Sequence, residues 1–227
     1  MLGTSHCLVF IWNNHPLPKT KKMRIATEVF GEWVAKGKDI GMEKGHAVAV
    51  EDMISFATQE RTNLKRNFSF LDLGCGNGWV VRKLENDPLC IRSVGIDGAK
   101  QMIEKAGKVD TKSEYLHENI DTYSSPEKFD LIHSMEVLYY LENPALTVKK
   151  ITDLWLNQGG RLIAGVDLYY ENQESHSWEE KVGTKMMMLK EAEWIEIFSS
   201  AGLKEVKSWR SNQSQGWAGT LVLTGKK

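Results

Sequence analysis

The stretch FLDLGCGNGWVV, residues 70–81, sets three glycines directly after a short apolar run that ends near a carboxylate. Gly74, Gly76 and Gly78 predict a loop that a nucleotide can approach closely, because glycine tolerates positive φ and lacks a side chain. The dinucleotide fingerprint G-x-G-x-x-G fails, since its third glycine falls at Trp79. The Walker phosphate loop fails as well, because no Gly-Lys-Ser or Gly-Lys-Thr follows.

Two carboxylates near this loop indicate the chemistry of its ligand. Asp72 lies two residues before Gly74, where it would repel a pyrophosphate but accept hydrogen bonds from an ammonium group. Asp97 ends the next predicted strand, about twenty residues on, where a carboxylate accepts ribose hydroxyls. Together they predict a nucleoside with a cationic amino-acid tail, and S-adenosylmethionine is such a molecule.

The elements that must position these residues alternate between strands and helices. The predicted strands are residues 68–73, 91–97, 113–118, 129–134 and 161–166, followed by a terminal hairpin at 203–209 and 220–224. A helix is expected from Gly45, and another presents Val148, Ile151, Leu154 and Trp155 as one apolar face until Gly159-Gly160 stops it. Such alternation predicts an α/β fold with a doubly wound, mostly parallel sheet, whose ligands bind at the carboxyl ends of the strands.

Five segments in order resemble the motifs of class I S-adenosylmethionine-dependent methyltransferases of the small-molecule type. They are DLGCGNG (72–78), VGIDGAKQMIEKA (94–106), YLHENI (115–120), FDLIHSMEVLYYLENP (129–144) and GGRLIAGVD (159–167). The resemblance implies a seven-stranded sheet with the last strand antiparallel and an N-terminal helical cap. It also implies a SAM-dependent methyltransferase with S-adenosylmethionine as its cofactor.

The resemblance carries the cofactor site onto particular residues of this chain. The expected cofactor-binding residues are Asp72, Gly74, Cys75, Gly76, Gly78, Asp97, Gly98, Met102, Asn119, Ile120, Ser134 and Met135. Asn119 is expected near the adenine amino group and Ile120 near its ring. Cys75 is expected to contribute through its backbone, although a helix N-terminus nearby would lower the pKa of a thiol.

His46 and Glu136 are the candidate catalytic residues that orient or deprotonate the acceptor. His46 lies at the start of a helix expected to lie over the cofactor, and imidazole changes charge near neutral pH. Its alternative is a surface residue at a helix start, and Glu136 could equally be a carboxylate that the helix dipole favours. The candidate substrate pocket is Trp33, Tyr139, Tyr140, Tyr169 and Tyr170. Trp33 could instead anchor the cap, Tyr139 and Tyr140 could be core or rim aromatic residues, and Tyr169 and Tyr170 could belong to a mobile surface loop.

Composition limits the remaining possibilities. The 227 residues carry 29 basic and 30 acidic side chains, without the basic excess of a nucleic-acid binder. No apolar run spans a membrane and the three scattered cysteines suggest a reducing compartment, so a cytoplasmic monomer or homodimer is expected. No metal is expected, since no carboxylate cluster is apparent in the sequence.

The expected organisation is a flexible extension (1–22), then one methyltransferase domain (23–227) made of cap helices (23–66) and a cofactor-binding core (67–227). Met1 or Met23 could be the start. The predicted activity is methyl transfer to nitrogen or oxygen of a small-molecule acceptor. The alternatives are a methyltransferase acting on a protein and a non-catalytic regulatory protein that keeps the cofactor site, because fold does not fix function.

Overall fold

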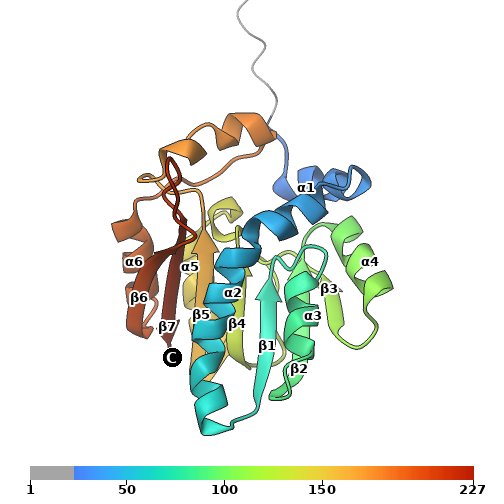
Figure 1. The fold of residues 1–227 in the computed structure, drawn as a ribbon, viewed down its shortest axis with the longest axis vertical. Coiled ribbons are helices and arrows are strands. Elements are labelled where there is room, and N and C mark those ends of the chain that lie inside the picture. The colour runs from blue at the N-terminus through green and yellow to red at the C-terminus, as the bar shows by residue number, and fades with distance from the viewer. Residues whose placement is uncertain (1–22) are drawn as a thin grey trace, which may run out of the picture.

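A seven-stranded sheet forms the centre of the molecule in the computed structural model, which describes residues 23–227 (Figure 1). The strands are β1 (Phe68–Leu73), β2 (Cys90–Asp97), β3 (Glu114–His117), β4 (Phe129–Met135), β5 (Leu156–Val166), β6 (Lys204–Ser211) and β7 (Thr220–Lys226). Their order is β3-β2-β1-β4-β5-β7-β6. The pairs from β3 to β5 are parallel, and β7 is antiparallel to β5 and β6. This topology confirms the predicted fold class. The predicted extension, residues 1–22, lies outside the described residues.

Helices cover both faces of the sheet, which is why the central strands are almost continuously apolar. The helices are α1 (Ala26–Ala35), α2 (Lys38–Leu64), α3 (Trp79–Glu85), α4 (Lys100–Val109), α5 (Pro144–Lys150) and α6 (Glu191–Ser200), with short turns η1 (Leu138–Tyr140), η2 (Ile151–Trp155), η3 (Gln173–Ser175) and η4 (Glu179–Gly183). Phe70 packs in the cluster that includes residues of α2 and α3, whereas Leu71 packs with residues of η2 and α6. Successive residues of β1 therefore serve opposite cores, as the alternation of a strand requires.

Two predicted elements differ from the structure. α2 begins at Lys38, earlier than the Gly45 start expected from the apolar spacing. The helix after Pro144 ends in a π-helical turn, η2, whose wider turn changes the direction of the side chains that follow, and Leu154 is 53% exposed. β5 begins at Leu156, so Gly159 and Gly160 lie inside a strand and do not end the helix.

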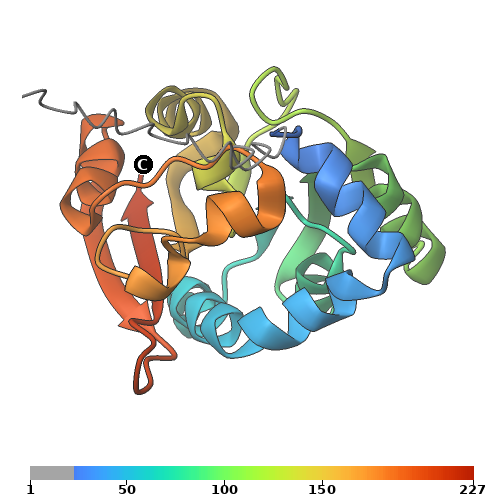
Figure 2. The same cartoon turned by 90° about the horizontal axis from the view of Figure 1, so that it is seen from above.

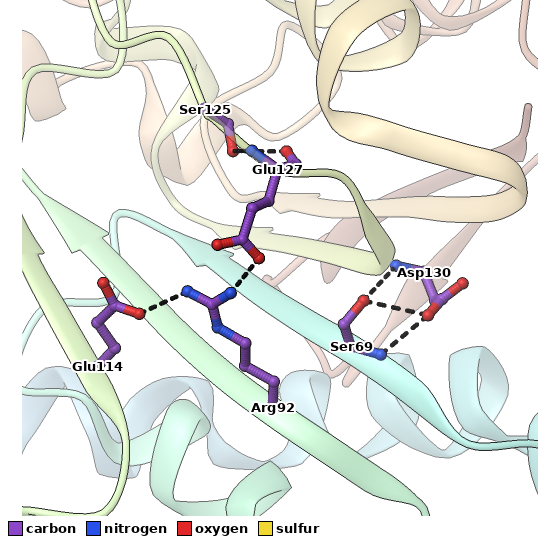
Figure 3. A network of polar contacts seen from close by, with 6 residues as sticks. All are labelled: Ser69, Arg92, Glu114, Ser125, Glu127 and Asp130. Atoms are coloured by element: carbon purple, nitrogen blue, oxygen red, sulfur yellow. Dashed lines mark hydrogen bonds and ion pairs between the residues drawn. The ribbon is translucent and has the colours of Figure 1, made fainter.

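The amino ends of the strands are held by a polar network (Figure 3). The Asp130 carboxylate of β4 accepts hydrogen bonds from the backbone N–H and the hydroxyl of Ser69 in β1, at 3.0 and 3.1 Å. Arg92 of β2 forms ion pairs with Glu114, at 2.6 Å, and with Glu127. These contacts join four neighbouring strands at the end of the sheet opposite to the predicted site.

The carboxyl ends of the strands lie under a cover made of two distant segments. α1 and the segment 167–190 both lie at this end of the sheet (Figures 1 and 2). A backbone hydrogen bond of 2.9 Å from Arg24 to Gly183 joins the segment before α1 to the end of η4. Among residues 23–227, none of the helices combines the length and the apolar character that crossing a membrane requires.

Candidate active site

A cavity of about 620 Å³ is lined by residues at the carboxyl ends of the strands and by residues of α1, the start of α2 and η4. Its volume falls within the roughly 300–1,000 Å³ of typical ligand sites. Fifteen of the residues proposed from the sequence line it: Trp33, His46, Asp72, Gly74, Cys75, Gly76, Asp97, Gly98, Met102, Asn119, Ile120, Met135, Glu136, Tyr139 and Tyr140. The chain thus brings together residues that are separated by up to about a hundred positions, as the rule for parallel sheets requires.

The glycine loop joins β1 to α3 and is shaped by positive φ angles. Gly74 has φ 74°, and a Cβ there would lie 2.2 Å from a methyl carbon of Val137. Gly78 has φ 78°, precedes α3, and a Cβ there would lie 2.5 Å from the Tyr115 ring. These positions require glycine because both the backbone conformation and the space exclude a side chain.

Asp97 fixes the loop and still has acceptor capacity for a ligand. One carboxylate oxygen accepts from the Gly76 N–H at 2.9 Å and the other from the Ala99 N–H at 2.7 Å. A carboxylate offers about four acceptor positions, so about one remains on each oxygen, which is the pattern that two ribose hydroxyls require. Burial raises the pKa of Asp97, and the two backbone donors oppose that rise. The residue therefore fits a ribose-bearing cofactor.

Asp72 forms a buried pair with His133, a residue that the sequence analysis did not select. His133 Nδ1 donates to an Asp72 carboxylate oxygen at 2.7 Å, and both side chains are almost fully buried. Both residues also line the cavity. Nε2 of His133 is buried without a hydrogen-bond partner among the described residues. The pair follows from the sheet, since β1 and β4 are adjacent and residues 72 and 133 are in register, a relation that the sequence alone does not show.

A second cluster joins His46, Glu136 and Asp167. Each offers a ligand atom, and these atoms all lie within 4.8 Å of one another. His46 comes from α2, Glu136 follows β4 and Asp167 follows β5. No such cluster is evident in the sequence, because only the fold brings α2 over the ends of these strands. Nε2 of His46 is 3.8 Å from a carboxylate oxygen of Asp167.

Glu136 is held rigidly in an unusual conformation. Its φ is 61°, which is uncommon for a residue with a side chain and costs on the order of 1–3 kcal/mol. One carboxylate oxygen accepts from the Asp167 N–H and the other from the Tyr139 hydroxyl at 2.5 Å. Burial, then the nearby Asp167 charge, raises the pKa of Glu136 well above its ordinary value despite these two donors.

Burial also changes the protonation of the other two members. It raises the pKa of Asp167 to about 6, while the Thr220 side chain opposes the rise. It lowers the pKa of His46, which favours the neutral imidazole. One oxygen of Asp167, Oδ1, is buried and makes no hydrogen bond within the described part of the chain. The cluster can therefore accept a proton or a positively charged group.

Four of the residues proposed from the sequence do not line the cavity. The Tyr169 hydroxyl donates to the Gly219 carbonyl at 2.9 Å within the core, and Tyr170 is 55% exposed on the surface. The Ser134 hydroxyl donates to the Leu73 carbonyl at 3.0 Å. Gly78 shapes the start of α3 from behind the loop. Each has a structural partner that accounts for its position.

The cover contributes residues that the sequence analysis missed. Asn77 of the loop donates to Asp39 at 3.1 Å and to Glu43 at 3.2 Å, and so joins the loop to α2. Phe30 of α1 also lines the cavity. The register of a cap helix over a loop depends on tertiary packing, so its spacing alone did not identify these contacts.

Residues 45–208 match the family model described as "Methyltransferase domain". The chain is 27% identical over 133 residues to (S)-coclaurine N-methyltransferase of Papaver somniferum, a match that covers 52% of this chain and 37% of that protein. It is 27% identical over 115 residues to malonyl-[acyl-carrier protein] O-methyltransferase 2 of Ilyobacter polytropus, which covers 48% and 44%. The matches thus span less than half the length of these curated relatives.

Among solved structures, the fold is similar to that of the proposed methyltransferase in a complex with the Haloferax volcanii Trm112 methyltransferase activator. The TM-score is 0.74 at 27% identity, and the alignment covers 87% of this chain and 96% of that one. The chain belongs to the methyltransferase domain family. The class identified from its motifs, a class I S-adenosylmethionine-dependent methyltransferase, is confirmed, and S-adenosylmethionine is the cofactor of that class.

Proposed function

We propose that this protein transfers the methyl group of S-adenosylmethionine to a nitrogen or oxygen atom of a small-molecule acceptor. The observation that carries the proposal is the position of Asp97, which closes the glycine loop and keeps acceptor positions directed at a ligand with two neighbouring hydroxyls. The relatives include both an N-methyltransferase and an O-methyltransferase, which supports either acceptor atom.

The proposed cofactor contacts are made by residues that line the cavity. Asp97 accepts the ribose hydroxyls, Asn119 and Ile120 lie along the adenine, and Gly74, Cys75 and Gly76 contact the cofactor through their backbone. Burial, followed by the nearby Asp97 and Asp72 charges, raises the pKa of the Cys75 thiol well above its ordinary value, which disfavours the nucleophilic thiolate. Asp72 and Met135 lie beside the methionine part, and the aromatic cover excludes water.

The bound cofactor supplies an activated methyl group on a sulfonium, which is already a good leaving group. The protein's task is therefore to hold the acceptor atom in line with that carbon, and positioning of this kind can contribute on the order of 7–11 kcal/mol. Glu136 and His46 line the cavity where they can orient the acceptor or accept its proton. The lining Tyr139 and Tyr140 provide an apolar wall for the acceptor.

Calorimetric titration of the full chain with S-adenosylhomocysteine tests the proposal. The wild type should bind, and Asp97→Asn should weaken binding at least about tenfold, because each charge-assisted hydrogen bond contributes roughly 1.5–3 kcal/mol. Asp153→Asn, an exposed change on η2, is the matched control and should bind as the wild type does. Absence of binding by the wild type, or equal binding by Asp97→Asn, would contradict the proposal.

A further inference from the structure

The cavity has a strong excess of acidic side chains. Seven carboxylates line it, against one lysine, Lys181 of η4, among the described residues. Several of these carboxylates already have partners of their own: Asp39 is paired with Lys105, Asp72 with His133, and Asp97 with backbone N–H groups. Like Asp97, Glu136 has only uncharged donors, the Tyr139 hydroxyl and the Asp167 N–H, but its carboxylate lies within 4.8 Å of the His46 imidazole.

A row of aromatic rings leads to Glu136. The rings of Trp33 and Phe30 meet edge to face with centroids 5.0 Å apart, and Phe30 meets Tyr140 in the same way at 5.2 Å. Tyr140 then contacts Tyr139 at 4.5 Å, and the Tyr139 hydroxyl reaches the Glu136 carboxylate. All these rings line the cavity. Aromatic faces attract organic cations, so the wall and the carboxylate at its end favour the same kind of ligand.

His46 stands beside this carboxylate in a state that can accept a proton. Its side chain is 25% exposed, whereas the Asp167 side chain behind it is 6% exposed. The Asp167 carboxylate lies 3.8 Å from Nε2 of His46, and its other oxygen has no hydrogen-bond partner within the described residues. An imidazolium formed at His46 would therefore find a buried anion directly behind it.

We propose, on the basis of the function proposed above, that the acceptor is an organic amine that enters as its ammonium ion, that Glu136 binds this charge, and that His46, backed by Asp167, removes the proton before transfer. The His46–Glu136–Asp167 cluster is then an amine site, with Glu136 and His46 as catalytic residues and Asp167 as a positioning residue. The aromatic row from Trp33 to Tyr139 holds the carbon skeleton of the amine.

The steps balance in atoms and charge. An ammonium nitrogen has no lone pair, so one N–H bond must break and its proton moves to the free nitrogen of His46. The amine lone pair then forms the new N–C bond while the C–S bond breaks, and the electron pair of that bond stays on sulfur. The product is a methylated ammonium ion, and His46 loses its proton to solvent before the next cycle. No oxidant, metal or further reactant is required.

A divalent cation is the rival occupant, since one imidazole and two carboxylates are ligands that such ions accept. One observation favours the amine: the cavity beside the cluster is walled by aromatic rings, which attract organic cations and offer no ligand atom to a metal ion. The experiments therefore include a chelator arm, in which loss of activity with EDTA and recovery with Mg²⁺ or Mn²⁺ would overturn the amine proposal.

The first experiment compares matched acceptors. The full chain is incubated with trideuteromethyl-labelled cofactor and a panel of primary and secondary arylalkyl and alkyl amines, together with the alcohols, phenols, thiols and carboxylic acids of the same skeletons. Mass spectrometry should find the labelled methyl group on amines and on no skeleton-matched neutral or acidic partner. Transfer to oxygen or sulfur, or transfer to no amine while S-adenosylhomocysteine still binds, would overturn the inference and leave the cofactor proposal intact.

The second experiment separates the roles of the three residues with the best amine of the panel. Glu136→Gln should raise the amine KM at least about tenfold, because a charge-assisted contact is lost. His46→Gln should lower kcat by about 10²–10⁴, and Asp167→Asn by about tenfold, with little change in KM. Glu104→Gln, an exposed change on α4, should leave both constants unchanged. Each variant must first bind S-adenosylhomocysteine as the wild type does, and equal effects on KM and kcat in all three would overturn the assigned roles.

The third experiment measures protons, which a merely structural cluster would not release. The groups around Asp167 are His46 from α2, Glu136 after β4, Thr220 from β7 and Tyr169, while Lys181 from η4 lines the same cavity as His46 and Glu136. A bound ammonium ion favours ionised carboxylates, so amine binding near pH 6 should release protons in calorimetry with two buffers of different ionisation enthalpy. Asp167→Asn should release fewer. Proton uptake, or release equal to that caused by the matched alcohol, would overturn the proposal.

Discussion

Two histidine–aspartate pairs stand at the carboxyl ends of the sheet, and they differ in almost every physical respect. His133 and Asp72 are in direct hydrogen-bond contact at 2.7 Å and are almost fully buried. His46 and Asp167 are 3.8 Å apart, and His46 is partly open to the cavity. The first pair joins neighbouring strands, whereas the second joins a cap helix to a strand end.

The difference indicates that the first pair is suited to hold the site rigid, whereas the second is suited to react to a ligand. A buried, closed pair cannot exchange partners without a large cost, so it suits the rigid base of a cofactor site. A loose pair with an unpartnered oxygen can change its protonation when a ligand arrives, because its charges are not yet compensated. If the two pairs differ in energy as they do in geometry, substitutions in the His133–Asp72 pair should lower the free energy of unfolding more than those in the His46–Asp167 pair.

The largest expected effect comes from removing each histidine. His133→Ala should lower the free energy of unfolding by about 3–5 kcal/mol, because the Asp72 carboxylate would be left buried without its partner. His46→Ala should cost about 1 kcal/mol or less, since the side chain is partly exposed and its contact with Asp167 is long. Urea denaturation followed by circular dichroism measures both.

His133→Gln serves as the control for this comparison, because an amide can still donate to Asp72. It should recover part of the stability lost in His133→Ala. If His133→Ala and His46→Ala lose the same unfolding free energy, the His133–Asp72 and His46–Asp167 pairs contribute equally to stability, which would contradict the difference expected from their geometry.

The next effect is the pH dependence of stability that Asp167 introduces. Its pKa is about 6 in the folded protein, compared with an ordinary value of 3.8. Below pH 3.8 the Asp167 carboxyl is neutral in both the folded and the unfolded state, so its burial does not lower the free energy of unfolding through ionisation. As the pH rises to about 6, the unfolded state loses its proton first, so stability is lost, by up to about 3 kcal/mol above pH 6. Asp167→Asn should therefore become more stable relative to the wild type as the pH rises from 4 to 7.

Urea titrations of both proteins at several pH values measure this difference. Asp110→Asn is an informative control, because that carboxyl has a pKa below its ordinary value: burial acts to raise it, but the Lys112 N–H and neighbouring donors outweigh burial. Because that pKa lies below 3.8, Asp110→Asn should lose stability relative to the wild type as the pH rises toward 4, which is the opposite sign, and the difference should then stay nearly constant from pH 4 to 7. A difference between Asp167→Asn and the wild type that stays flat with pH would contradict the buried-acid description.

The sequence predicted the glycine loop and its two carboxylates, but it did not predict His133 as the partner of Asp72. Glycine spacing, the end of a buried strand and the acid about twenty residues on all lie within one local unit, so Asp72, Gly74 and Asp97 could be placed before the structure was known. The pattern of buried strands likewise predicted the sheet and its terminal hairpin. β5 was misjudged at its start because a π-helical turn has no distinct sequence pattern.

The cluster of His46, Glu136 and Asp167 depends on contacts between segments that are distant in the sequence. His46 and Glu136 were selected one by one, but Asp167 was known only as a residue after a strand, and its approach to both follows from how α2 lies over the sheet. Tyr169 and Tyr170 show the reverse: adjacent tyrosines suggested a pocket, whereas packing places one in the core and the other on the surface. Aromatic residues serve cores and pockets equally well, so their type alone does not distinguish the two.

The smallest effect compares two buried tyrosine hydroxyls. Tyr139 donates to the Glu136 carboxylate at 2.5 Å, and Tyr169 donates to the neutral Gly219 carbonyl at 2.9 Å. If Glu136 is ionised, Tyr139→Phe should cost roughly 1.5–3 kcal/mol of unfolding free energy, against roughly 0.5–1.5 for Tyr169→Phe. Burial and Asp167 raise the pKa of Glu136, so the excess cost should shrink as the pH falls and the carboxyl gains its proton. Urea denaturation of both variants at pH 5 and pH 8 measures this. If the two variants lose the same unfolding free energy at every pH, Glu136 is neutral in the free protein. Glu136 and Asp167 would then ionise only when a cationic ligand binds.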